Sequence, residues 1–76
     1  MDYIGMLDRE FGRAHRIPRE NIEKVYNLAL NELQDDMNAY LAVLGLVSEL
    51  VRGTTVFDYS SLSKDTVKQI TRIIKA

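Results

Sequence analysis

Four basic side chains near the end of the sequence have the spacing of a phosphate-binding surface. Lys64, Lys68, Arg72 and Lys75 follow one another at intervals of four, four and three residues, which places them on one stripe of a helix. Like charges four residues apart repel by about 0.2–0.5 kcal/mol per pair on a helix, so stability alone does not explain the stripe. Cations gathered on one surface attract the phosphate groups of nucleic acids.

A second basic group lies near the start of the chain. Arg9, Arg13 and Arg16 are spaced by four and three residues, and Arg19 follows after a predicted turn. Residues 9–19 hold four arginines and one glutamate, and residues 64–76 hold four cations and one acid, so each segment carries +3 although the whole chain carries -1. If the first and last helices are neighbours, the two groups form one continuous basic face.

A basic helix face has an ordinary interpretation as well. Cations on the outer side of a final helix complement the helix dipole and are commonly only a solvated surface. The sequence leaves both interpretations open. If the face does bind nucleic acid, Tyr3 or Tyr59, where exposed, would offer an aromatic surface on which unpaired bases stack.

The middle of the chain is acidic and supports an alternative function. Residues 20–63 hold two cations and seven acids, a net charge of -5. Acidic surfaces attract basic protein partners, so the alternative is a protein-interaction module of the inhibitor, antitoxin-like or immunity type. The acidic residues that would form its surface are Glu20, Glu23, Glu32, Asp35 and Asp36.

Catalytic and metal-binding patterns are missing from the sequence. There is no Walker loop, no G-x-G-x-x-G, no H-E-x-x-H, no calcium-binding loop and no G-x-S-x-G. His15 is the single histidine and there is no cysteine, so we expect a surface histidine rather than a metal ligand. We therefore expect no enzymatic activity, no cofactor and no bound metal.

The length and composition predict one small globular domain over residues 1–76. Hydrophobic residues make up 46% of the chain and charged residues 28%, which is typical of a folded domain. The most apolar stretch, residues 39–51, is about 13 residues long, whereas a membrane span needs about 20. The lack of cysteine fits an intracellular protein, and we expect a cytoplasmic monomer or weak oligomer.

Helices must position the charged residues. Apolar spacing predicts one helix over residues 2–14 and another over residues 19–34, with a turn before Pro18. Residues 37–52 predict a third helix, apolar nearly all round and therefore central. Asp35 or Asp36 would cap it; otherwise the second and third helices form one bent rod. Gly45 either lets a neighbouring backbone come close or is simply tolerated.

The last third of the chain predicts a connector and a fourth helix. Residues 54–61 are expected to be extended and pinned by Val56, Phe57 and Tyr59. The helix that follows would begin after Ser63 as its cap, with three isoleucines facing the core. Four helices with short connections predict a compact all-α bundle.

Two stretches resemble the HRDC module, a small helical domain attached to RecQ-type helicases. YIGMLDREFGRAHRIPRENI, residues 3–22, is similar to its first helix and turn, and LAVLGLVSELVRG, residues 41–53, to a later apolar segment. Gly45-Leu46-Val47 stands where the family has a G-V-G hairpin. The resemblance implies binding of single-stranded or branched DNA, in an accessory role in recombination, replication or repair. The chain is also similar in length to small phage proteins encoded beside recombination helicases.

Overall fold

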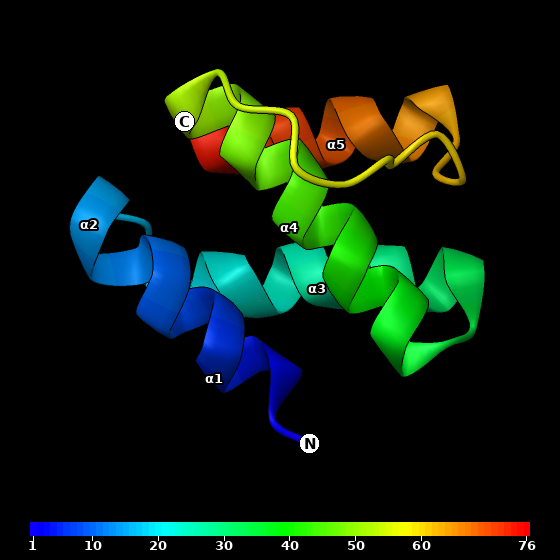
Figure 1. The fold of residues 1–76 in the computed structure, drawn as a ribbon, viewed down its shortest axis with the longest axis horizontal. Coiled ribbons are helices and arrows are strands. Elements are labelled where there is room, and N and C mark those ends of the chain that lie inside the picture. The colour runs from blue at the N-terminus through cyan, green and yellow to red at the C-terminus, as the bar shows by residue number, and fades with distance from the viewer.

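The structure, a computed structural model, describes all 76 residues as four helical units without a strand (Figure 1). The first unit is a continuous helix whose middle part is π-helical. The segments are α1 (Tyr3–Leu7), η1 (Asp8–Gly12), α2 (Arg13–His15), α3 (Arg19–Leu33), α4 (Asp36–Arg52) and α5 (Lys64–Lys75). The predicted all-α four-helix bundle is confirmed.

Capping side chains set most of the helix boundaries. Asp35 has an extended backbone, and its carboxylate accepts a hydrogen bond of 2.8 Å from the N–H three residues further on. α3 and α4 are therefore separate helices, and the bent rod is excluded. Ser63 caps α5 in the same way, as predicted. Arg16 and Gln34 end α2 and α3 in the left-handed conformation, with φ of 55° and 57°.

The central helix α4 organises the bundle. It packs against α3 in an antiparallel pair, and both α1 and α5 pack against that pair (Figure 1). α4 supplies five of the 14 buried hydrophobic residues of the core and α3 supplies four, so α4 shares its predicted central place with α3. Gly45-Leu46-Val47 lies within α4 and forms no hairpin. No helix is both long enough and apolar enough to cross a lipid bilayer.

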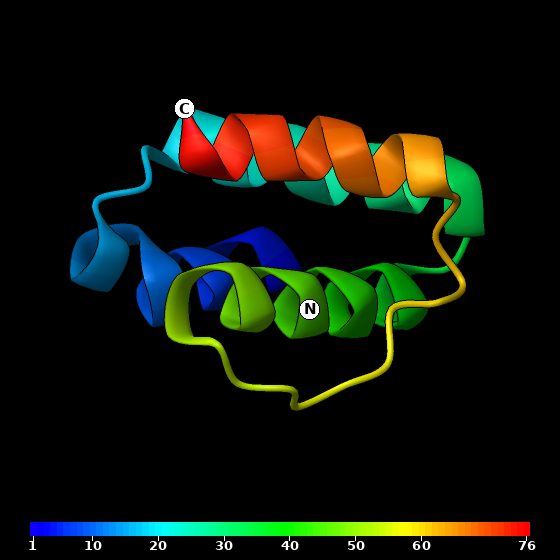
Figure 2. The same ribbon diagram turned by 90° about the horizontal axis from the view of Figure 1, so that it is seen from above.

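The first and last helices do not form a packed pair. Figure 1 shows α1 and α5 at opposite edges with α3 and α4 between them, and Figure 2 shows α1 layered with α4 and α3 layered with α5. The two outer helices cover different apolar faces of the same central pair, and this keeps them apart. The first and last helices are therefore not neighbours, and the two basic groups do not merge into one face.

A backbone contact holds the connector between α4 and α5. A Cβ atom on Gly45 would lie 2.3 Å from the carbonyl oxygen of Phe57, so this glycine does admit a neighbouring backbone. Val56 and Phe57 are 48% and 42% exposed, so they hold the connector only in part. Tyr59 does hold it, since its hydroxyl donates a hydrogen bond to the Glu49 carboxylate.

Gly45→Ala should lower the free energy of unfolding by about 0–2 kcal/mol. Alanine favours a helix by about 1 kcal/mol over glycine, but overpacking against a rigid backbone costs about 1–3 kcal/mol. Chemical denaturation gives the stability, and amide hydrogen exchange over residues 54–61 reports whether the connector loosens. A variant more stable than the parent would contradict the close contact.

Candidate nucleic-acid interface

The structure leaves most of the predicted binding cations without a partner inside the chain. Arg19 is the exception, since it forms ion pairs of 3.5 Å with Asp8 and 3.6 Å with Glu23. The other seven predicted residues are exposed and form neither an ion pair nor a side-chain hydrogen bond. These seven are Arg9, Arg13, Arg16, Lys64, Lys68, Arg72 and Lys75.

The seven cations form two groups in space. We call Arg9, Arg13 and Arg16 the N-terminal arginines, and the four cations of α5 the α5 stripe. Because α1 and α5 do not pack together, the groups do not merge into the single face expected from the sequence. Both views place α2 and the C-terminal end of α5 at the same end of the long axis (Figures 1 and 2). The α5 stripe therefore runs along the bundle toward the end that carries α2.

The N-terminal arginines belong to the irregular part of the first helix. Arg9 lies in η1 and Arg13 in α2, and with Asp8 they line a hollow of about 330 Å³. Arg16 follows in the left-handed conformation at the turn before α3. This conformation is uncommon for a residue with a side chain. Arg9 and Arg13 are thus exposed beside the ion-paired Asp8, and Arg16 is exposed at the turn that follows.

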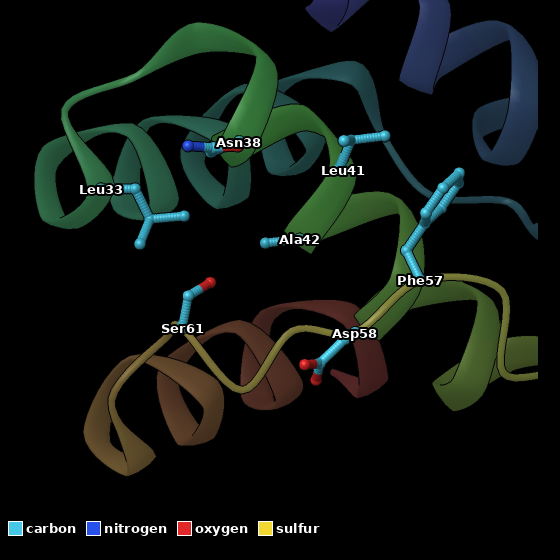
Figure 3. Close-up of a pocket in the computed structure, with 7 residues that line it drawn as sticks. All are labelled: Leu33, Asn38, Leu41, Ala42, Phe57, Asp58 and Ser61. Carbon is cyan, nitrogen blue, oxygen red and sulfur yellow. The ribbon is translucent and has the colours of Figure 1, made fainter.

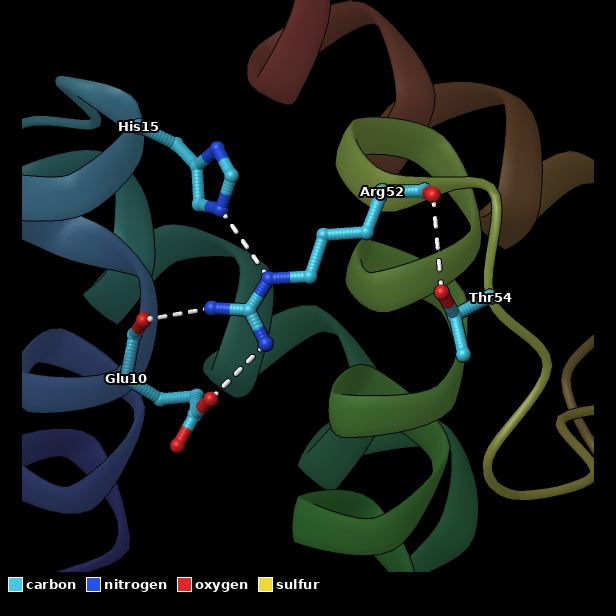
Figure 4. Close-up of polar contacts among 4 residues, drawn as sticks. All are labelled: Glu10, His15, Arg52 and Thr54. Carbon is cyan, nitrogen blue, oxygen red and sulfur yellow. Dashed lines mark hydrogen bonds and ion pairs between the residues drawn. The ribbon is translucent and has the colours of Figure 1, made fainter.

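Arg52 is a cation that the structure uses internally. Its guanidinium donates hydrogen bonds to the Glu10 carboxylate at 2.8 Å, to the Glu10 carbonyl at 3.0 Å and to Nε2 of His15 at 3.1 Å (Figure 4). It also lies 4.9 Å from the centre of the Phe11 ring. These contacts tie the end of α4 to the first helix. They also engage Nε2 of His15 as an acceptor, and no group of three potential metal-binding side chains exists in the chain.

Only one of the two tyrosines considered for base stacking lacks an aromatic partner within the chain. Tyr3 stacks on Tyr40 with ring centres 4.9 Å apart and also lies 6.4 Å from the ring of Tyr26. The ring of Tyr3 therefore packs against other aromatic rings of the chain. Tyr59 is half-buried in the connector and has no aromatic partner.

The carboxylates contrast with the cations. Nine of the 11 acidic side chains accept a hydrogen bond or an ion pair within the chain, whereas only two of the ten basic side chains are engaged. Most of the acids that would form the protein-binding surface of the alternative function are among these nine. Glu23 pairs with Arg19, and Asp35 caps α4. Only Glu20 and Asp36 have side chains without a partner.

Glu32 accepts two hydrogen bonds from the beginning of the last helix. Its carboxylate accepts hydrogen bonds from the Ser63 N–H at 2.7 Å and from the Thr66 hydroxyl at 2.8 Å. Hydrogen bonds to the ionised form, those from Ser63 first and that from Thr66 next, hold the pKa of Glu32 below its ordinary value. The contacts join α3 to the beginning of α5.

A groove beside the connector is chemically unsuited to phosphate. It has a volume of about 300 Å³ and is lined by Leu33, Asn38, Leu41, Ala42, Phe57, Asp58 and Ser61 (Figure 3). Its single charged group is the Asp58 carboxylate, whose pKa is lowered by hydrogen bonds from the backbone and hydroxyl of Ser60. A negative charge repels phosphate, so this groove is not part of the candidate interface.

Known proteins do not place the chain in a family. No protein-family model, no curated protein and no solved structure matches it. The HRDC resemblance therefore stays a prediction. Function has to be inferred from the unpaired cations and the grooves beside them.

Arg52→Ala should lower the free energy of unfolding by about 1–3 kcal/mol. The substitution removes three hydrogen bonds and the contact with the Phe11 ring, each of which contributes modestly at a half-exposed site. Thermal or chemical denaturation measures the change. Lys24→Ala is the matched control, because Lys24 is exposed and unpaired and its loss should change stability by less than about 0.5 kcal/mol. Equal effects of the two substitutions would refute the role of Arg52.

Glu32→Gln should reduce the loss of stability in acid. The folded-state pKa of Glu32 is lowered, so its contribution is present above the ordinary value of 4.5 and is lost as the pH falls through the folded value. The parent protein should thus lose more stability than the variant between about pH 6 and about pH 3. Unfolding curves across this range test the difference. Glu20→Gln removes an acid without a partner and should leave the pH dependence unchanged.

Proposed function

We propose that the chain is a small non-catalytic module that binds single-stranded or branched nucleic acid through its phosphate groups. The α5 stripe makes the main contacts, and the N-terminal arginines extend them at one end of the bundle. The observation that carries the proposal is the set of seven exposed cations without a partner in the chain. In keeping with the HRDC resemblance, the role is that of a helicase accessory in recombination, replication or repair.

The α5 stripe is a self-contained binding surface. α5 buries Ile70 and half-buries Ile73 and Ile74, and this orientation turns all four of its cations outward. The stripe therefore does not need the first helix beside it to follow a phosphate backbone. A strand that follows α5 to its C-terminal end reaches the end of the bundle where α2 lies (Figure 2).

The carboxylates already accept hydrogen bonds within the chain, and this favours nucleic acid over a basic protein as the partner. Hydrogen bonding does not remove the charge of a carboxylate, but it fixes the oxygen atoms that a partner's donors would have to reach. Glu23, Glu32 and Asp35 are fixed in this way. The seven cations have no such commitment, so a phosphate gains their hydrogen bonds without breaking any within the chain.

Fluorescence anisotropy with a labelled single-stranded oligonucleotide at low salt tests the proposal. We expect weak, saturable binding whose logarithm falls with the logarithm of the salt concentration. Four phosphate contacts on a single strand give a slope of about -3, and participation of the N-terminal arginines makes it steeper. Absence of binding at high micromolar protein would overturn the proposal.

Charge reversal identifies the surface. Lys68→Glu should weaken binding and make the salt slope shallower, and Lys68→Glu with Arg72→Glu should abolish binding. Lys24→Glu is the matched control, because Lys24 is exposed and unpaired but lies on α3 outside both groups. Equal loss from Lys68→Glu and Lys24→Glu would show a response to net charge rather than to the α5 stripe.

A further inference from the structure

One groove on the surface combines an aromatic ring with unpaired cations. It lies where the end of the connector meets the first turns of α5 and has a volume of about 490 Å³. This is within the range of about 300–1,000 Å³ that is usual for small-ligand sites. Its lining residues are Tyr59, Ser60, Leu62, Lys64, Val67 and Lys68.

The lining has the chemistry of a nucleotide rather than that of a purely apolar ligand. Tyr59, Leu62 and Val67 form an apolar surface, while Lys64 and Lys68 stand one helical turn apart on the same side of α5. Neither lysine has a partner in the chain, and no carboxylate lines the groove. A nucleotide joins a flat base to a phosphate, and so matches a groove with an apolar part and a cationic part.

The other four hollows of the molecule lack the combination. Two of them contain carboxylates and no cation, namely the groove of Figure 3 with Asp58 and its neighbour with Asp58 and Glu49. The hollow between Arg9 and Arg13 contains Asp8 and no apolar side chain. The hollow between α3 and α5 has one lysine and no aromatic ring.

The ring of Tyr59 is held in place from one end. Its hydroxyl donates a hydrogen bond to the Glu49 carboxylate on α4, and this bond raises the pKa of Tyr59 above its ordinary value of 10.0. The phenol therefore stays neutral and tethered at neutral pH. A ring fixed in this way loses little conformational freedom when a base stacks on it.

Resting on the nucleic-acid binding proposed above, we infer that this groove seats one unpaired base of a single strand. The base stacks on Tyr59 above Leu62 and Val67, and the adjoining phosphates contact Lys64 and Lys68. The strand then continues along α5 toward Arg72. The inference gives the module a preference for unpaired over fully paired nucleic acid, because a base inside a duplex cannot enter the groove.

Comparison of an oligothymidylate with an abasic strand of the same phosphate number tests the inference on the unaltered protein. Base stacking on an aromatic side chain is usually equivalent to about tenfold or more in affinity, so the intact strand should bind about tenfold more tightly. Both strands should show the same dependence on salt, since they offer the same phosphates.

Three substitutions in the connector sharpen the test. Tyr59→Leu should remove the preference for the intact strand and leave the affinity for the abasic strand unchanged. Tyr59→Phe keeps the ring and should keep most of the preference. Phe57→Leu is the matched control, because Phe57 is an exposed aromatic residue of the same connector whose groove holds no cation.

The possible outcomes separate the two proposals. Binding of both strands with equal affinity overturns the base-seating groove and leaves the phosphate contacts of α5 in place. Loss of the preference in Phe57→Leu as well as in Tyr59→Leu also overturns it. Absence of binding to either strand overturns the proposed function and the groove together.

Discussion

The burial of α4 is the constraint on which the rest of the structure depends. This helix has apolar residues on nearly every side, and an exposed apolar face would be costly in water. Three helical units are therefore needed to cover it, and each can do so only with its own apolar side turned inward. The outward direction of the charged side chains follows from this inward packing. So does the separation of α1 from α5, because each covers a different side of the central pair.

The division of labour between the two signs of charge has a chemical origin. Helix N-termini expose backbone N–H groups, which need acceptors, and a carboxylate is a short and strong one. Asp2 and Asp35 fill this role directly, while Glu32 supports the cap residue Ser63 of α5. Lysine and arginine offer only donors, which these positions cannot use. Most carboxylates thus make contacts within the fold, while most lysine and arginine side chains stay exposed without a partner. For this reason a protein with a net negative charge presents basic surfaces.

Local patterns were enough to predict the helices, but not how distant side chains meet. The predicted cap at Ser63 is confirmed, and among the alternatives that the sequence left open the structure selects Asp35 as the cap of α4 and a close backbone approach at Gly45. The Arg52 contacts join residues 37 and 42 positions apart, and nothing in the sequence around either partner points to the other.

The candidate site was predicted in its residues but not in its geometry. Lys64, Lys68 and Arg72 are exposed on one helix because three- and four-residue spacing fixes their side of α5. The expected union with the N-terminal arginines depended on which helices pack together, and periodicity does not determine that. The role of Tyr59 depended on the path of the connector. Its tether to Glu49 came from the folding of an irregular segment, where no repeating pattern exists to be read.

The way the connector is attached has a consequence for how freely this protein can change over evolutionary time. The chain crosses α4 by resting its main chain on a glycine, and Val56 and Phe57 stay about half exposed beside that attachment. Substitutions at these two positions should therefore cost less than substitutions in the buried core. Successive mutations at these positions could therefore change the exposed side chains of the connector while the fold stays the same.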